Sequence, residues 1–227
     1  HGRLRIAGDN TLFAMPETGI GYFPDVGGSY FLPRLSDNAG LWLGLTGARI
    51  DMSMACALGV ANAYIPSDQQ EAFIDALGAA ELDGSDKAIE VVLMQFVQTP
   101  SPVVMPEGLT CFGEGSVADI LKSLEARDDD WSVKQAATIR KKSPLASCAT
   151  FEALRQGAVF NFREAMNQEL QISLGFLETQ DFYEGIRAQL IDKDRNPKWS
   201  SETIETVTAT QVERIFRNRT APLDYIA

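Results

Sequence analysis

The sequence predicts an α/β protein with a short β-containing segment at its N-terminal end and a largely helical region after it. Arg3–Ala7 alternates polar and apolar residues, which is typical of a half-buried strand. After Ser36, apolar residues recur at helical spacing in most of the chain. We therefore expect two domains, residues 1–66 with the β segments and residues 67–227 with most of the helices.

The first domain is expected to consist of short elements. Thr11–Ala14 is predicted to be a second extended piece, which Pro16 ends. The following stretch, Glu17–Gly28, holds too many glycines and prolines for a regular element. Two short strands are marginal as an isolated sheet, so this domain should need partner strands from outside the chain. The later elements expected here are helices at Ser29–Leu32, Asn38–Leu45 and Met52–Leu58, with Asp51 and Gly59 capping the last, and an extended Val60–Ile65.

The second domain is expected to be helical. Ser67 and Gln70 have the spacing of a capping box and predict a helix that continues to Leu77. Ser116 has the position of an N-cap, because apolar residues follow it at helical spacing. Thr99–Gly115, with three prolines and three glycines, is predicted to be a loop. Further helices are predicted at Ser132–Arg140, Pro144–Gln156 and Asn161–Gln180; on the last, Phe162, Met166, Leu170, Leu174 and Leu177 form an apolar stripe, which indicates core or a subunit contact.

The composition argues against several classes of protein. A net charge of −11 disfavours nonspecific binding to nucleic acid or anionic membranes, so neither is an expected partner. No apolar run approaches the roughly 20 residues of a membrane span, and no signal or transit peptide is visible. Cys56, Cys111 and Cys148 are widely spaced and form no CxxC pair, which is typical of free buried thiols in a reducing compartment.

Most catalytic chemistries lack their residues in this sequence. The one histidine is the terminal His1, a poor member of a Ser-His-Asp or Cys-His arrangement. There is no GxSxG elbow, no glycine-rich nucleotide-binding motif and no cluster with zinc-ligand spacing. If the protein is an enzyme, we expect carboxylate chemistry.

Two acidic residues are the candidates for that chemistry. Glu17 and Asp25 are eight positions apart and are flanked by apolar side chains. A carboxylate among such groups loses hydration, which raises its pKa towards neutral pH. Asp25 directly precedes Val26 and the pair Gly27-Gly28, where a helix could begin and offer free N–H donors. Spacing alone leaves open the alternative that both acids cap turns on the surface.

Several blocks of the sequence resemble one known family. Phe13–Thr18, Phe23–Gly28 and Tyr30–Leu35 look like the crotonase (enoyl-CoA hydratase/isomerase) superfamily, and within it the 3-hydroxyisobutyryl-CoA hydrolase branch is the nearest match. The branch's next block resembles Leu45–Ile50. Its C-terminal signature resembles Gln180–Ala188 and Ile191–Trp199. The resemblance covers about Arg3 to Trp199 and is weak over Asp68–Ser132.

The resemblance implies a fold and a reaction. Residues 1–66 would be the C-terminal part of a crotonase-like ββα-spiral core, and a helical region would follow. The reaction would be hydrolysis of a short 3-hydroxyacyl-CoA thioester to the free acid and CoA, as in valine-type catabolism. Glu17 would bind substrate as general base or nucleophile, and Asp25 would bind the 3-hydroxyl or orient water. CoA is then part of the substrate, and no cofactor is implied.

The resemblance also implies a missing part of the site. Crotonases hold the thioester oxygen with two backbone N–H groups, and both segments that supply them would lie before His1. Losing one such donor costs about 10²–10³ in rate. We therefore expect an N-terminal crotonase segment or a companion fragment as partner, and no acyl-CoA hydrolysis by these 227 residues alone.

Alternatives remain at this point. An enoyl-CoA hydratase or isomerase usually carries a small residue at the position of Asp25, and a noncatalytic crotonase-like interaction subunit would need no oxyanion donors. The acyl group is open, because one methyl group changes binding by only about 1–3 kcal/mol. A homo-oligomer is compatible with the family. A cytoplasmic location is expected, with the mitochondrial matrix as the alternative for a eukaryotic protein.

Overall fold

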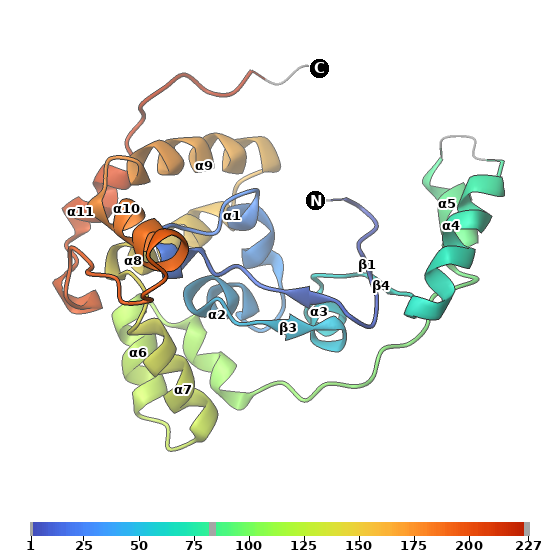
Figure 1. Ribbon diagram of the computed structural model, residues 1–227, viewed down its shortest axis with the longest axis horizontal. Coiled ribbons are helices and arrows are strands. Elements are labelled where there is room, and N and C mark those ends of the chain that lie inside the picture. The colour runs from blue at the N-terminus through green and yellow to red at the C-terminus, as the bar shows by residue number, and fades with distance from the viewer. Residues whose placement is uncertain (1, 82–84, 225–227) are drawn as a thin grey trace. The chain divides into compact units, whose positions relative to one another are not determined.

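The computed structural model of the chain describes residues 2–81 and 85–224 (Figure 1). Its contacts divide the chain into two compact units, and each unit is made of two separate stretches. Unit 1 consists of His1–Phe13 with Arg49–Val104, and unit 2 of Ala14–Ala48 with Met105–Ala227. These units group residues by contact and not by chain order, so the domain division at residue 66 stays a prediction.

Unit 1 contains two small sheets of two strands each. In the first, β1 (Ile6–Ala7) pairs in parallel with β4 (Ala63–Tyr64). In the second, β2 (Leu12–Phe13) pairs antiparallel with β3 (Ile50–Asp51). The three extended segments expected in this part of the chain are therefore present. Each strand has only two residues and pairs within the chain, so the need for partner strands from outside stays a prediction.

The first helix of unit 1 has the ends that the sequence predicts. α3 (Met52–Leu58) begins where the Asp51 carboxylate accepts a hydrogen bond from the Met54 N–H at 2.9 Å. It ends at Gly59, whose φ of 84° is left-handed. An aspartate at the N-cap and a glycine at the C-cap satisfy the backbone groups that a helix leaves free at its ends.

The capping box predicted at Ser67 is wrong. Ser67 begins a short 3-10 turn, Ser67–Gln69, and only then does α4 (Gln70–Ala79) start. The Ser67 N–H is bound by the carboxylate of Asp9 at 2.7 Å, while the Gln70 side chain donates to the Ile65 carbonyl at 3.3 Å. Both groups of the box are thus satisfied by other partners. α5 (Asp86–Leu93), which the sequence reasoning missed, packs on α4.

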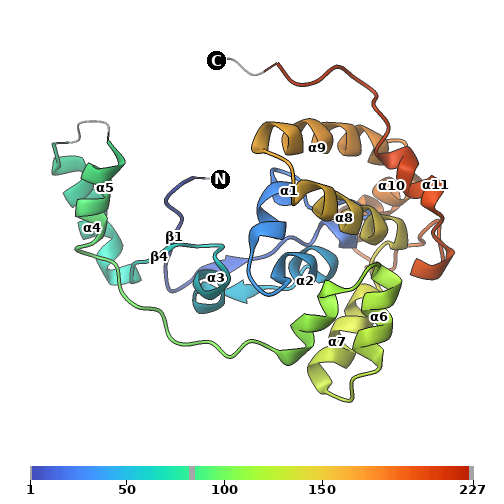
Figure 2. The ribbon, with the colours of Figure 1, turned by 180° about the vertical axis from the view of Figure 1, so that it is seen from behind.

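Unit 2 is helical, with its core around one central helix. α8 (Pro144–Gly157) contacts α1 (Gly28–Phe31), α2 (Ala39–Thr46) and α11 (Ala209–Ile215). α9 (Phe162–Phe176) also contacts α1, so that α8 and α9 both lie beside it in the two opposite views (Figures 1 and 2). The buried cluster formed there comprises Phe23, Leu145, Ala146, Ala149, Ala153, Ile172, Phe176 and Ile215.

The remaining helices of unit 2 begin at polar caps. Ser116 caps α6 (Val117–Glu125) through a 3.1 Å bond from the Asp119 N–H, as expected. Asp129 caps α7 (Asp130–Ile139), which starts two residues before the predicted Ser132. In the expected loop Thr99–Gly115, the second half forms a 3-10 segment, Glu107–Gly113, which buries Leu109 and Phe112.

The helix predicted over Asn161–Gln180 is shorter than expected. α9 ends at Phe176, and Thr179 caps α10 (Gln180–Ile186), after which Arg187–Ile191 forms a π-helical segment. The buried face of α9 includes Ala165, Glu169 and Ile172, whereas Phe162 and Leu177 at the two ends of the apolar stripe are exposed. The stripe as a whole is therefore not the core face, and its use as a subunit contact stays a prediction.

Candidate active site

Glu17 lies on a tight turn of unit 2. Glu17–Ile20 forms a 3-10 turn, although the sequence suggested no regular element here. The turn ends at Gly21, whose φ of 70° is left-handed, and the Tyr22 N–H then donates to the Glu17 carbonyl at 3.1 Å. A single 3-10 turn needs only local hydrogen bonds, so the glycines and prolines around it do not prevent it.

The C-terminal block of the sequence supports this turn. Ser143, the N-cap of α8, donates its N–H to the Thr18 carbonyl at 3.1 Å and its hydroxyl to the Asp181 carboxylate at 2.5 Å. Asp181, at the start of α10, is fully buried and also accepts the Ser200 N–H at 2.7 Å. A Cβ atom on Gly185 would lie 2.2 Å from the Ile20 carbonyl group. Only glycine lets α10 come this close to the turn.

The Glu17 carboxyl group is held in an environment that opposes its ionisation. The pKa of Glu17 is raised to about 7, because burial and, to a smaller extent, the negative charge of Asp25 outweigh a backbone hydrogen bond and the Lys142 charge. Its Oε2 atom is buried and has no hydrogen-bond partner within the described residues. The pKa shift has the direction expected from the sequence. A carboxylate of this kind can take up a proton near neutral pH.

Asp25 lies on a strained loop that leads into α1. Its carbonyl accepts the Gly28 N–H at 2.8 Å, and the two residues between them have left-handed φ values, 50° at Val26 and 86° at Gly27. α1 begins at Gly28, so the glycine pair opens a helix as predicted. Asp25 is half-buried, and burial raises its pKa. The alternative that both acids cap turns on the surface does not describe Glu17, because the Oε2 atom of Glu17 is buried. Asp25 lies near enough to Glu17 for its charge to raise the pKa of Glu17.

Lys142 is a member of the site that the sequence reasoning missed. Its Nζ atom lies 3.4 Å from the position that a Cβ would occupy on Gly19, and at the same distance for Gly47. Burial lowers the pKa of Lys142, while the charge of Glu17 raises it. It forms no ion pair or hydrogen bond through Nζ within the part of the chain that the structure describes. The sequence shows two adjacent lysines before α8, and nothing in it tells which one points inward.

Glu169 is a second missed residue. This glutamate of α9 is 3% exposed and accepts the Gly27 N–H at 2.8 Å, the Ser29 N–H at 3.0 Å and the Ser29 hydroxyl at 2.6 Å. Burial raises its pKa, and these three hydrogen bonds act in the opposite direction. Glu169 lies four positions after Ala165 and three before Ile172, so it shares a helical face with these two apolar residues. This spacing could have indicated from the sequence that Glu169 is buried.

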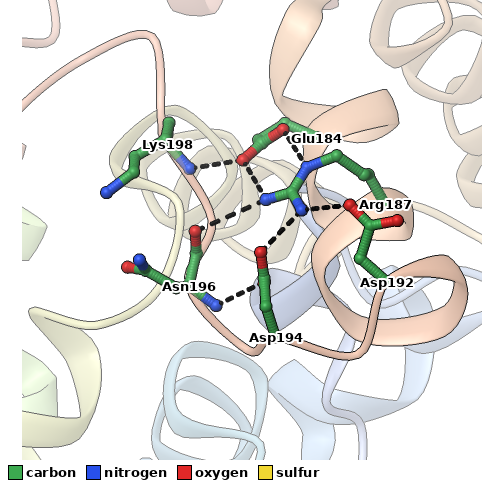
Figure 3. Close-up of polar contacts among 6 residues, drawn as sticks. All are labelled: Glu184, Arg187, Asp192, Asp194, Asn196 and Lys198. Atoms are coloured by element: carbon green, nitrogen blue, oxygen red, sulfur yellow. Dashed lines mark hydrogen bonds and ion pairs between the residues drawn. The ribbon is translucent and has the colours of Figure 1, made fainter.

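Acidic side chains surround Arg187 just after the C-terminal end of α10. The Arg187 guanidinium contacts both carboxylate oxygens of Glu184 at 2.8 and 2.9 Å, Asp192 at 2.6 Å and Asp194 at 2.7 Å (Figure 3). The carbonyl of Asn196 and the N–H of Lys198 complete the cluster, and the pKa of Glu184 falls to about 2. Arg187 therefore fastens the segment after α10 to that helix. These contacts use all the N–H donors of its guanidinium, so none is free to bind a ligand such as a phosphate.

Within residues 2–81 and 85–224, no three His, Cys, Asp or Glu side chains are grouped so as to hold a metal ion. In the same part of the chain, none of the helices has the length and apolar character needed to cross a membrane. The three cysteines are free, and only Cys111 is fully buried, whereas Cys56 and Cys148 are partly exposed. The expectation of three buried thiols is therefore correct for one of them.

Comparison with known proteins places the chain in a family. The enoyl-CoA hydratase/isomerase family matches residues 1–216. Proteins named 3-hydroxyisobutyryl-CoA hydrolase, mitochondrial, are similar to the chain: that of Xenopus laevis is 35% identical over 95% of this chain and 58% of its own length. That of Danio rerio is 37% identical over 95% of this chain and 59% of its own length. A probable 3-hydroxyisobutyryl-CoA hydrolase of Arabidopsis thaliana is 35% identical over 95% of this chain and 60% of its own length.

Solved structures agree with this placement. A carnitinyl-CoA dehydratase from Mycobacterium thermoresistibile is 35% identical, with a TM-score of 0.87 over 99% of this chain and 64% of that one. An enoyl-CoA hydratase from Rhodobacter sphaeroides is 32% identical, with a TM-score of 0.79 over 95% and 62%. The chain thus spans about three-fifths of the length of the relatives it matches. It has a crotonase-like fold, and it belongs to the enoyl-CoA hydratase/isomerase family.

Proposed function

We propose that this chain carries the catalytic carboxylates of an enzyme that hydrolyses a short 3-hydroxyacyl-CoA thioester, of the 3-hydroxyisobutyryl-CoA kind. The observation that carries the proposal is Glu17, with its buried, unpartnered Oε2 and a pKa of about 7, near the charge of Asp25. The names of the curated relatives from frog, fish and plant support the choice of substrate.

Glu17 is the base or the nucleophile of this reaction. As a base, its ionised Oε2 takes a proton from water while the water oxygen bonds to the thioester carbonyl carbon. The carbon–sulfur bond then breaks, and the proton on Glu17 passes to the departing CoA sulfur, which leaves the free acid. As a nucleophile, Glu17 bonds to the carbonyl carbon first, CoA leaves, and water hydrolyses the resulting anhydride. The structure is compatible with both routes.

Asp25 and Lys142 assist Glu17 in different ways. Asp25 accepts a hydrogen bond from the 3-hydroxyl of the acyl group or from the attacking water, because a carboxylate on a fixed loop is a directed acceptor. Lys142 favours the ionised form of Glu17 through its positive charge. The oxyanion donors belong to a crotonase segment or companion chain outside these residues, and CoA enters only as part of the substrate.

The setting of the reaction follows from the same proposal. The product acid would belong to valine-type catabolism, and no metal or redox cofactor would take part. A cytoplasmic location remains our first proposal. The mitochondrial matrix is the alternative that the names of the animal relatives favour.

The test measures release of CoA thiol from 3-hydroxyisobutyryl-CoA by the full-length gene product. Glu17→Gln and Asp25→Asn should each lower kcat/KM, Glu17→Gln by about 10²–10⁴-fold, since it removes the proton acceptor. Glu71→Gln, an exposed carboxylate of α4, is the matched control and should leave the rate unchanged. An active Glu17→Gln variant would refute the assignment of Glu17.

An enoyl-CoA hydratase is the second candidate, because two solved structures with a similar fold are described as a carnitinyl-CoA dehydratase and an enoyl-CoA hydratase. Asp25→Gly separates the two. A hydratase should tolerate a small residue at this position, whereas the hydrolase should lose activity. Hydration is measured as the loss of the conjugated enoyl absorbance, and hydrolysis is measured as the release of thiol.

A further inference from the structure

The loop that carries Asp25 is held from behind by a carboxylate that the proposed mechanism does not use. Glu169 lies on α9, 144 positions after Asp25 in the sequence, and its side chain is almost completely buried. Its two oxygens accept three hydrogen bonds, from the Gly27 N–H and from the N–H and hydroxyl of Ser29. These donors lie two and four positions after Asp25 in the sequence.

The backbone between Asp25 and these donors is strained and would not hold its shape by itself. Val26 is β-branched and has a φ of 50°, a conformation that such residues rarely adopt, and Gly27 continues it with a φ of 86°. Strained backbone of this kind persists only where surrounding contacts determine it. The side chain of Val26 is 64% exposed, so burial of that side chain is not what holds it. The hydrogen bonds that Gly27 and Ser29 donate to Glu169 are among the contacts that hold this backbone.

The same residue of α9 is also connected to the chain before Asp25. The Glu169 carbonyl accepts the Ser173 hydroxyl at 2.7 Å, and the Ser173 hydroxyl in turn accepts the Tyr22 hydroxyl at 2.7 Å. Tyr22 lies three positions before Asp25 and Gly27 lies two after it. α9 therefore fixes the loop on both sides of Asp25.

We propose that Glu169 is a positioning residue for Asp25: it holds the strained Val26-Gly27 backbone so that the Asp25 carboxylate points to the acyl group or the attacking water. This inference rests on the proposed function of Asp25. A carboxylate is needed at this place because three donors converge on it. An amide has one acceptor oxygen, and its NH₂ group would face a donor.

A purely structural role would have a different signature. If Glu169 only fastened α9 to α1, its replacement would lower stability and reduce the amount of folded enzyme without changing what Asp25 does. The sample as a whole would then lose the same fraction of activity whether or not Asp25 is present. A cycle of single and double variants distinguishes the two roles.

The experiment measures kcat and KM of the full-length gene product for 3-hydroxyisobutyryl-CoA and for isobutyryl-CoA, which lacks the hydroxyl. The variants are Glu169→Gln, Asp25→Asn and the double variant. Glu164→Gln is the matched control, since Glu164 also accepts a backbone N–H, but at the exposed start of α9. Glutamine keeps that capping bond, so the control should be unchanged.

We expect Glu169→Gln to lower kcat/KM for 3-hydroxyisobutyryl-CoA by about tenfold, and by no more than about twofold when Asp25 is already asparagine. If Asp25 binds the hydroxyl, isobutyryl-CoA hydrolysis will be unaffected; if Asp25 orients water, both substrates will slow alike. Ser29→Ala, which removes one of the three bonds, should give the same pattern at about two- to threefold, and it tests the inference if Glu169→Gln does not fold.

An equal loss in the two backgrounds would overturn the positioning role while leaving Asp25 in the mechanism. A different result, in which Asp25→Asn itself has no effect, would refute the proposed function of Asp25. The two failures are therefore distinguishable in one set of measurements.

Discussion

At the scale of single residues, the main finding is a glutamate whose charge is disfavoured by its surroundings. Burial and Asp25 raise the pKa of Glu17 to about 7, while a backbone hydrogen bond and Lys142 act against them. The group is thus poised between its two protonation states at neutral pH, where a general base is most effective. Two measurable consequences follow from this balance, one for activity and one for stability.

The first consequence is a pH profile. Because the proposed mechanism needs the ionised form of Glu17, kcat/KM of the full-length gene product should fall on the acid side with a midpoint near pH 7. Lys142→Met removes the charge that favours ionisation, so the midpoint should move to higher pH and the rate near about pH 6 should fall roughly three- to tenfold. Lys141→Met, at the exposed neighbouring position, is the control. An unshifted profile in Lys142→Met would contradict this role.

The second consequence concerns stability. The folded pKa of Glu17, about 7, lies above the ordinary value of 4.5 for a glutamate, so ionisation opposes folding. Stability from this group is fully present below about pH 4.5 and is lost as the pH rises through 7. Glu17→Gln should therefore raise Tm at about pH 8 by a few degrees, since it removes a penalty of about 1–2 kcal/mol after allowance for solvent screening.

The pH dependence of that gain is the decisive part of the measurement. The difference in Tm between Glu17→Gln and the parent should disappear at about pH 4, where both the folded and the unfolded carboxyl group are protonated. Glu71→Gln, at an exposed site, should show no such dependence. A gain that is the same at both pH values would mean that burial of the charge is not its cause.

At the scale of elements, α10 explains why a motif far along the sequence bears on Glu17. Gly21 and Gly185 let the helix and the 3-10 turn touch through their backbones, and the buried Asp181 ties the turn to the start of α8 through Ser143. The Arg187 cluster then closes the following segment onto α10 (Figure 3). The C-terminal signature is therefore a support for the Glu17 turn.

This contact predicts opposite effects of the same substitution at two helical glycines. Gly185→Ala places a Cβ 2.2 Å from the Ile20 carbonyl, so α10 must move and the free energy of unfolding should fall by about 2 kcal/mol or more. Gly78→Ala in α4 meets no atom within 4 Å and should raise stability by about 0.5–1 kcal/mol. Denaturant unfolding measures both, and equal effects would show that the close approach does not exist.

Gly185→Ala should also affect the chemistry if α10 supports Glu17. In the full-length gene product, we expect the folded enzyme to lose kcat more than it loses affinity for substrate, because a misplaced base slows the chemical step. Gly78→Ala should leave kcat unchanged. A fully active Gly185→Ala enzyme would mean that α10 contributes stability alone.

At the scale of the whole molecule, the chain carries the two proposed catalytic acids and spans about three-fifths of the length of its relatives. The family resemblance places both oxyanion donors in segments that these residues do not include. We therefore expect no measurable hydrolysis of 3-hydroxyisobutyryl-CoA by residues 1–227 alone, and activity when the remaining crotonase segment is supplied. Thioesterase activity of the 227 residues that Glu17→Gln abolishes would show this prediction to be wrong.

The sequence by itself determined the family, most helices and the local end signals of α3 and α6, because caps and periodicity depend on neighbours within a few positions. Tertiary structure decided the rest. The Ser67 N–H donates to Asp9 and not to the Gln70 side chain, so the expected capping box does not form. The break between α9 and α10 interrupts an apolar pattern that is continuous in the sequence. Lys142 and Glu169 joined the candidate site only through folding. Helical spacing could have indicated that Glu169 is buried, but contacts between segments more than 100 positions apart are not encoded in any local pattern.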